Sequence, residues 1–171
     1  MTGTEKQFDD FVDAIKLKQT QVDRIESARK SLTKLLKESF DLADDDVFVQ
    51  GSYANDTAVR PIEGGEYDID IVVVTADDED SATDAIRDVF DVLEDSRYKD
   101  KIEERQPCIR VTYADEVIGG FHVDVIPLRA STSDDHDAPF EAPRKGSGWH
   151  GTAPREYTDW CSEQGELFQR T

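Results

Sequence analysis

The chain has 171 residues, with 39 acidic and 20 basic side chains and a formal net charge of −19 at pH 7. This excess of negative charge argues against a protein that binds nucleic acid or an anionic membrane through a basic surface. Hydrophobic residues make up 37% of the sequence, which supports one folded domain and excludes an intrinsically disordered chain.

The sequence predicts a reduced, cytoplasmic protein. No apolar run approaches the roughly 20 residues that span a bilayer, and residues 1–10 are polar, unlike a signal peptide. Cys108 and Cys161 stand far apart and form no metal-binding or redox pattern. We interpret the acidic excess as adaptation to salt, because a highly charged surface stays soluble in concentrated salt; the alternative is an ordinary acidic protein from a low-salt cell.

The N-terminal quarter of the chain is predicted to be helical. Apolar residues recur at helical spacing over residues 5–40, either as one long N-terminal helix with a break near Thr20 or as two helices. The β-branched and aromatic segment 47–50 predicts a strand. A loop is expected over 51–55, and the segment 57–66, rich in Gly and Pro, is expected to be either irregular or a hairpin turn.

The clearest strand is 67–75, in which two acidic residues lead into an apolar run. A loop is expected over 77–80. A helix is then predicted to begin at Ser81, because an acidic residue stands three positions further on, as in a capping box.

Two antiparallel strands are predicted over 109–113 and 117–128, joined near 114–116. Residues 130–153 are polar and rich in Gly, Pro and Asp, which predicts a long loop. The last segment, 155–170, is predicted to be a helix, with Trp160 packed against the rest of the chain.

Asp68 and Asp70 are the most informative pair of acids. Side chains alternate along a strand, so both carboxylates point to one face while Ile69 and Ile71 enter the core. Two like charges beside apolar sequence repel each other and resist desolvation, and a divalent cation is the usual compensation. The alternative is a strand end whose acids lie in solvent.

Asp124 is a single acid inside a second apolar strand, Phe121–Pro127. If that strand lies beside the Asp68/Asp70 strand, three carboxylates converge, which is a site for two Mg²⁺ ions. The alternative for Asp124 alone is a buried acid paired with an arginine. His122 shares the face of Asp124, either near the metals or as a structural histidine.

Gly51 and Ser52 follow the predicted strand 47–50. Glycine lets the backbone approach a ligand closely, and a serine hydroxyl with neighbouring N–H groups can hold phosphate oxygens. A Gly-Ser pair is usually no more than a turn, but this one stands shortly before Asp68.

The order Gly51-Ser52, Asp68-x-Asp70 and then Asp124 on a later strand resembles the DNA polymerase β-like nucleotidyltransferase superfamily. The segments QGSYANDTAVRP, EYDIDIVVV, FHVDVIPL and WHGTAPREYTDW are similar to the bacterial and archaeal relatives of cyclic GMP-AMP synthase and oligoadenylate synthetase. That family makes nucleotide second messengers in antiviral defence.

The resemblance implies an α+β fold, with a mixed β-sheet backed by helices. It implies two Mg²⁺ or Mn²⁺ ions on Asp68, Asp70 and Asp124, with Gly51 and Ser52 on the triphosphate of an NTP substrate. Asp124 would also help to activate the acceptor hydroxyl.

Three segments follow from this family pattern. Residues 1–45 are expected to be a helical region and 46–154 the catalytic core. Residues 155–171 are expected to begin a helical lobe that is otherwise missing and that another chain or a regulatory partner could supply.

The leading hypothesis is transfer of NMP from NTP to a hydroxyl, with release of pyrophosphate. One alternative is a nucleotidyltransferase that modifies RNA ends or proteins. Another is a catalytically idle domain that only binds nucleotide and metal.

Salt adaptation predicts that stability rises with ionic strength, because salt screens the repulsion among like charges. We expect the melting temperature to rise by several degrees between about 0.1 M and about 2 M KCl. Thermal melts followed by circular dichroism measure this, and a melting temperature that is flat or falls with KCl would contradict the interpretation.

Overall fold

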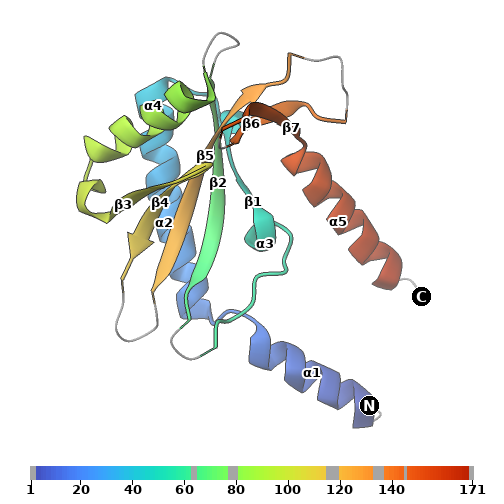
Figure 1. The fold of residues 1–171 in the computed structure, drawn as a ribbon. Coiled ribbons are helices and arrows are strands. Elements are labelled where there is room, and N and C mark those ends of the chain that lie inside the picture. Colours follow the sequence, from blue (N-terminus) through green and yellow to red (C-terminus); the bar gives the residue numbers. More distant parts are fainter. Residues whose placement is uncertain are drawn as a thin grey trace.

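The computed structural model describes residues 3–62, 65–76, 81–114, 120–132, 137–144 and 146–169. Its strands form one mixed sheet, and α2 and α4 pack against a single face of that sheet (Figure 1). Within these described ranges, no helix combines the length and the apolar composition needed to cross a membrane.

The N-terminal region forms two helices, α1 (Gly3–Ile15) and α2 (Gln19–Phe40), with the break just before Thr20. Lys18 is extended, so the first helix cannot continue through it. Its backbone N–H donates to the Gln21 side chain, and this capping contact marks the start of α2. No residue of α1 is buried, and this helix extends away from the sheet (Figure 1). The buried core residues of the N-terminal region therefore come from the 22-residue α2.

The strands of the main sheet run in the order β1–β2–β5–β4–β3. Their bounds are β1 (Val47–Gln50), β2 (Tyr67–Ala76), β5 (Phe121–Ala130), β4 (Cys108–Tyr113) and β3 (Ile102–Arg105). β2 and β5 are parallel, whereas β1 pairs with β2, and β4 with β5, in antiparallel fashion. The predicted β4–β5 antiparallel pair is confirmed, while β3 is a strand that the sequence did not indicate.

The predicted long loop over 130–153 is wrong. The segment contains a hairpin of β6 (Phe140–Arg144) and β7 (Gly148–Thr152), and β6 extends the sheet at the end of β5. The ring of Phe140 lies 6.1 Å from that of Phe48 on β1. This contact between segments far apart in sequence supports a hairpin whose own residues have weak strand propensity.

The remaining helices are α3 (Gly51–Ala54), α4 (Ala82–Glu94) and α5 (Pro154–Gln169), with short 3-10 turns η1 (Asp44–Asp46) and η2 (Lys99–Lys101). The α4 and α5 predictions are confirmed. The Ser81 side chain accepts from the Asp84 N–H and thereby caps α4 as expected.

Three smaller expectations have different outcomes. The loop expected over 51–55 is instead the four-residue helix α3. The described part of 57–66 is irregular as predicted, apart from a single bridge between Val59 and Lys16. The loop expected over 77–80 and most of the connection after β4 lie outside the described residues.

The core occupies the face of the sheet that α2 and α4 cover. Alternate residues of β2 and β5 enter it, and all of these are fully or almost fully buried: Tyr67, Ile69, Ile71, Val73, Phe121, Val123 and Val125. The intervening residues point to the opposite face, because side chains alternate along a strand. That opposite face carries the acids predicted to be functional.

Candidate active site

Two neighbouring strands bring the predicted acids to one face of the sheet. The parallel register of β2 and β5 sets Asp70 directly beside Asp124, and Asp68 beside His122. The expectation that the Asp124 strand lies next to the Asp68/Asp70 strand is therefore confirmed. The catalytic and metal-binding roles of these residues stay predictions.

Arg110, on β4, is a residue of this site that sequence reasoning did not single out. It faces Asp124 across the β4–β5 pair, and its Nε and Nη2 each donate to one carboxylate oxygen at 2.8 Å. Asp124 is only 9% exposed, so this two-pronged ion pair is well shielded from water. Asp124 is thus a buried acid paired with an arginine, as one of the two hypotheses expected, and its role as a metal ligand stays a prediction.

Asp68 and Asp70 form no ion pair with any residue that the structure describes. Burial, together with the negative charges of Asp68 and Asp124, raises the pKa of Asp70 to about 6. The positive charge of Arg110 opposes this rise only in part. The site therefore holds more negative charge than its own cations balance.

The donor set suits a hard divalent cation, because Mg²⁺ and Mn²⁺ prefer carboxylate oxygens. Burial and, after it, the neighbouring carboxylates raise the pKa of Asp70, and a bound cation would favour its charged form instead. In the described residues no three Asp, Glu, His or Cys side chains are grouped so as to hold one ion. Both oxygens of Asp124 are instead engaged by Arg110.

Gly51 lies directly against Asp70. A Cβ atom built on Gly51 would stand 2.2 Å from Asp70 Oδ2, far inside van der Waals contact, and the φ angle of Gly51 is +74°. Only glycine meets both conditions without strain. The backbone at Gly51 thus makes the close approach that we expected at this position, and the group it approaches is the Asp70 carboxylate.

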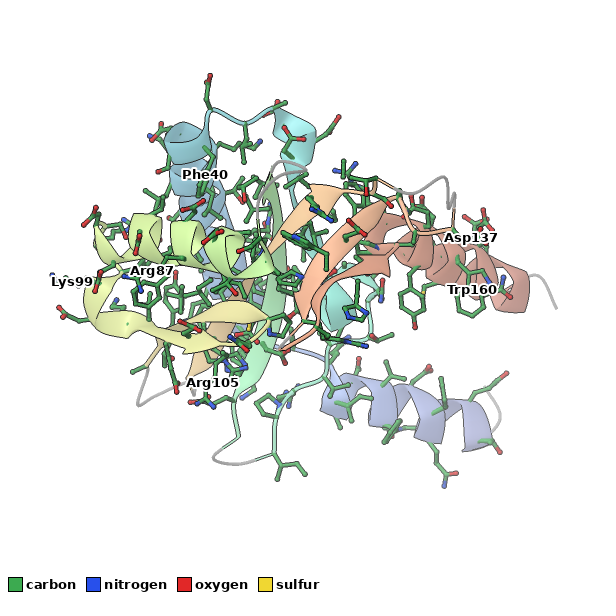
Figure 2. The ribbon with its side chains drawn as sticks, turned by 45° about the horizontal axis from the view of Figure 1, so that its top comes forward. Phe40, Arg87, Lys99, Arg105, Asp137 and Trp160 are labelled. Atoms are coloured by element: carbon green, nitrogen blue, oxygen red, sulfur yellow. The ribbon has the colours of Figure 1, made fainter. Side chains whose placement is uncertain are left out.

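A cavity of about 450 Å³ opens beside Gly51, between α3 and the start of α5. Asn55 and Tyr157 contribute to its walls, and Thr158 Oγ1 donates to Asn55 Oδ1 at 2.8 Å. Tyr157 is 58% exposed and its ring stacks on that of Trp160. Because Trp160, labelled on α5 in Figure 2, is 55% exposed, its predicted packing role is wrong.

His122 and its neighbour Glu66 stand at the N-terminal end of this face. The His122 Nδ1 atom lies 3.4 Å from Glu66 Oε2, and this buried Nδ1 has no hydrogen-bond partner among the described residues. This contact with Glu66 favours the structural role over the metal-binding one.

Replacing Gly51 by alanine should destabilise the protein more than the same change at Gly146. Both glycines have φ near +74°, so both substitutions add backbone strain of about 1–2 kcal/mol. Only Gly51 has a neighbour in the way, whereas Gly146 has open space. We expect Gly51→Ala to lower the free energy of unfolding by about 2–4 kcal/mol, measured with urea. Equal losses for the two variants would contradict the close packing against Asp70.

Asp70 should make metal-free protein less stable as the pH rises. Its pKa is raised in the folded state from an ordinary value of 3.8, so the folded protein holds the proton more tightly than the unfolded chain. The free energy of unfolding therefore falls between about pH 4 and pH 6, by up to about 3 kcal/mol from this group.

Asp70→Asn removes that loss, so its stability advantage over the wild type should grow through this window in urea titrations with EDTA. The matched control is Asp91→Asn, on the exposed surface of α4, for which the difference should not depend on pH in this way. Parallel curves for Asp70→Asn and the wild type would show that Asp70 titrates normally.

Comparisons with known proteins bear on the fold and the family of this chain. A c-di-GMP synthase of Roseivirga ehrenbergii is 25% identical over 156 residues, which are 88% of this chain but only 40% of that protein. The solved structure of the Bradyrhizobium diazoefficiens CD-NTase CdnG in complex with GTP superposes with a TM-score of 0.68 at 20% identity. That match covers 87% of this chain and 43% of the CdnG chain.

A crystal structure of the cyclic AMP-GMP synthase DncV of Vibrio cholerae gives a TM-score of 0.67 at 17% identity, covering 89% of this chain and 57% of DncV. These structures confirm the α+β fold with a mixed sheet backed by helices. The model of the Second Messenger Oligonucleotide or Dinucleotide Synthetase domain matches residues 1–165. The chain therefore belongs to the second messenger oligonucleotide or dinucleotide synthetase family, as its motifs predicted.

Proposed function

We propose that this chain is the catalytic portion of a metal-dependent nucleotidyltransferase that joins purine nucleotides into a cyclic dinucleotide second messenger. The observation that carries the proposal is the set of Asp68, Asp70 and Asp124 on one face of the sheet, with negative charge left uncompensated around Asp70. Family membership and the named products of the c-di-GMP and cyclic AMP-GMP synthases support the reaction class. A role in antiviral defence rests on the sequence resemblance.

The proposed reaction forms a bond from an acceptor hydroxyl oxygen to the α-phosphorus of an NTP. The bond from that phosphorus to the bridging oxygen breaks, and pyrophosphate leaves. Two Mg²⁺ or Mn²⁺ ions held by Asp68, Asp70 and Asp124 would stabilise the negative charge that develops on the phosphoryl oxygens.

Asp124 is the residue proposed to bind and orient the acceptor hydroxyl. The Arg110 fork fixes the plane of the carboxylate and occupies one lone pair on each oxygen, which leaves one lone pair on each for a ligand. An Asp124 oxygen can then accept a hydrogen bond from the hydroxyl and orient it. Gly51 and Ser52 are proposed to hold the triphosphate, because Gly51 lies against Asp70 and lines the cavity that α5 borders, and Ser52 follows it at the start of α3.

Efficient transfer is proposed to need protein beyond these residues. The chain spans 40% of the c-di-GMP synthase and between 43% and 60% of the solved relatives. A substrate held on one side only is positioned loosely, and an error of about 1 Å can cost about a hundredfold in rate. We expect the 171-residue chain to bind Mn²⁺ and to turn over NTPs slowly. Robust turnover by the isolated chain would contradict this part of the proposal.

The test is release of pyrophosphate from mixed ATP and GTP with Mn²⁺, with the product identified by mass spectrometry. We expect Asp70→Asn and Asp124→Asn to lower the rate at least about a hundredfold, because each removes a proposed metal ligand. The matched control Asp91→Asn should keep the wild-type rate. A rate unaffected by Asp70→Asn, or a linear product joined to RNA or protein, would overturn the proposal.

A further inference from the structure

A second cavity lies on the face of the sheet opposite to the acids. Its volume is about 370 Å³, within the range of small-molecule sites, and it opens where α2 meets η2 and the ends of β4 and β5. Tyr113 and Phe121 line it, and both belong to the alternate residues that face the helices. Asp70 and Asp124 point the other way, so the cavity is separate from the candidate active site.

Among the residues that the structure describes, the charged side chains lining this cavity are all cations, Arg24, Arg97 and Lys101, in a chain with about two acids for every base. Arg97 and Lys101 make no ion pair with a carboxylate in the part of the chain that the structure describes. They contact aromatic rings instead: Arg97 Cζ lies 5.0 Å from the centre of the Tyr98 ring, and Lys101 Nζ 5.7 Å from that of Tyr113.

Another groove with several cations runs along the surface of α2, and it offers a contrast. Three of its basic residues are already held by acids, in the pairs Arg29–Glu26, Lys34–Glu38 and Lys37–Asp44. Exposed pairs of this kind are ordinary surface features. The cavity at η2 differs because two of its cations retain unmatched charge.

We propose that the cavity at η2 binds a small phosphorylated molecule. Guanidinium and ammonium groups are the usual partners of phosphate oxygens, and the Ser27 and Ser31 hydroxyls in the wall can donate as well. A phosphate group carries up to two negative charges, so it matches the convergent cations better than a carboxylate does. A long polyanion is disfavoured, because the net charge of −19 repels it outside this cavity.

The floor of the cavity is preformed. Phe121 is stacked between Tyr67 and Tyr113, with ring centres 5.2 and 4.6 Å away, and Arg24 Cζ lies 5.0 Å from the Phe121 ring centre. These packed rings hold the sheet side of the cavity in place. Binding therefore requires ordering only of the exposed Arg97 and Lys101 side chains, on the edge where Lys99 is labelled in Figure 2.

The test is titration calorimetry of the full chain with pyrophosphate in EDTA, which removes any metal-dependent binding at the acids. We expect saturable binding, and a Kd at least about tenfold higher in the double variant Arg97→Gln/Lys101→Gln. The matched control Arg87→Gln/Lys6→Gln changes the net charge equally at cations that are already paired, so its Kd should stay within about twofold.

The variant Asp68→Asn/Asp70→Asn should bind at least as tightly as the wild type, which separates this cavity from the active site. Absence of saturable binding in the wild type would overturn the proposal. So would an unchanged Kd in Arg97→Gln/Lys101→Gln, or equal losses in the control. Thermal melts confirm that each variant is folded, and none of these readouts depends on turnover.

Discussion

The parallel register between β2 and β5 is the constraint on which the rest of the structure depends. It places Ile69 beside Val123 in the core and Asp70 beside Asp124 on the opposite face. A slip of one residue would exchange these faces, bury the acids under α2 and α4, and expose the apolar residues. The hydrophobic core thus fixes the position of the carboxylates, and the acids need no mutual attraction to remain together.

The acids repel one another in this position, and the fold compensates their negative charge only in part. Arg110 neutralises Asp124 through a shielded two-pronged contact, whereas Asp68 and Asp70 have no ion-pair partner in the described chain. Gly51 packs against Asp70 and limits the room in which its carboxylate can turn away. The burial of the core offsets this local repulsion, as is common where a fold preorganises a functional site.

The sequence predicted what alternation along single strands determines, and it failed where contacts between distant segments decide. Asp68 and Asp70 share a face because side chains alternate along a strand with a period of two residues. The apolar run around Asp124 indicated that its strand is buried. The pairing of β4 with β5 was predicted, but the partnership of Arg110 with Asp124 also depends on the register of that pair. A turn near 114–116 does not give the observed register, in which Tyr113 stands opposite Phe121. The β6–β7 hairpin was missed because Phe140 gains its stabilising contact from Phe48, more than ninety positions earlier.

In this chain, a basic side chain without an acidic partner is more informative than an acidic side chain without a basic one. With 39 acids and 20 bases, an acid without a partner is expected, so the isolation of Asp68 and Asp70 alone indicates little. Burial makes the isolation of Asp70 informative, because desolvation of its carboxyl group, together with the neighbouring carboxylates, raises its pKa. A base without an acid is the exception here, since carboxylates are in excess over the whole surface. Arg97 and Lys101, which have no acidic partner among the described residues, are therefore informative even though both side chains are exposed.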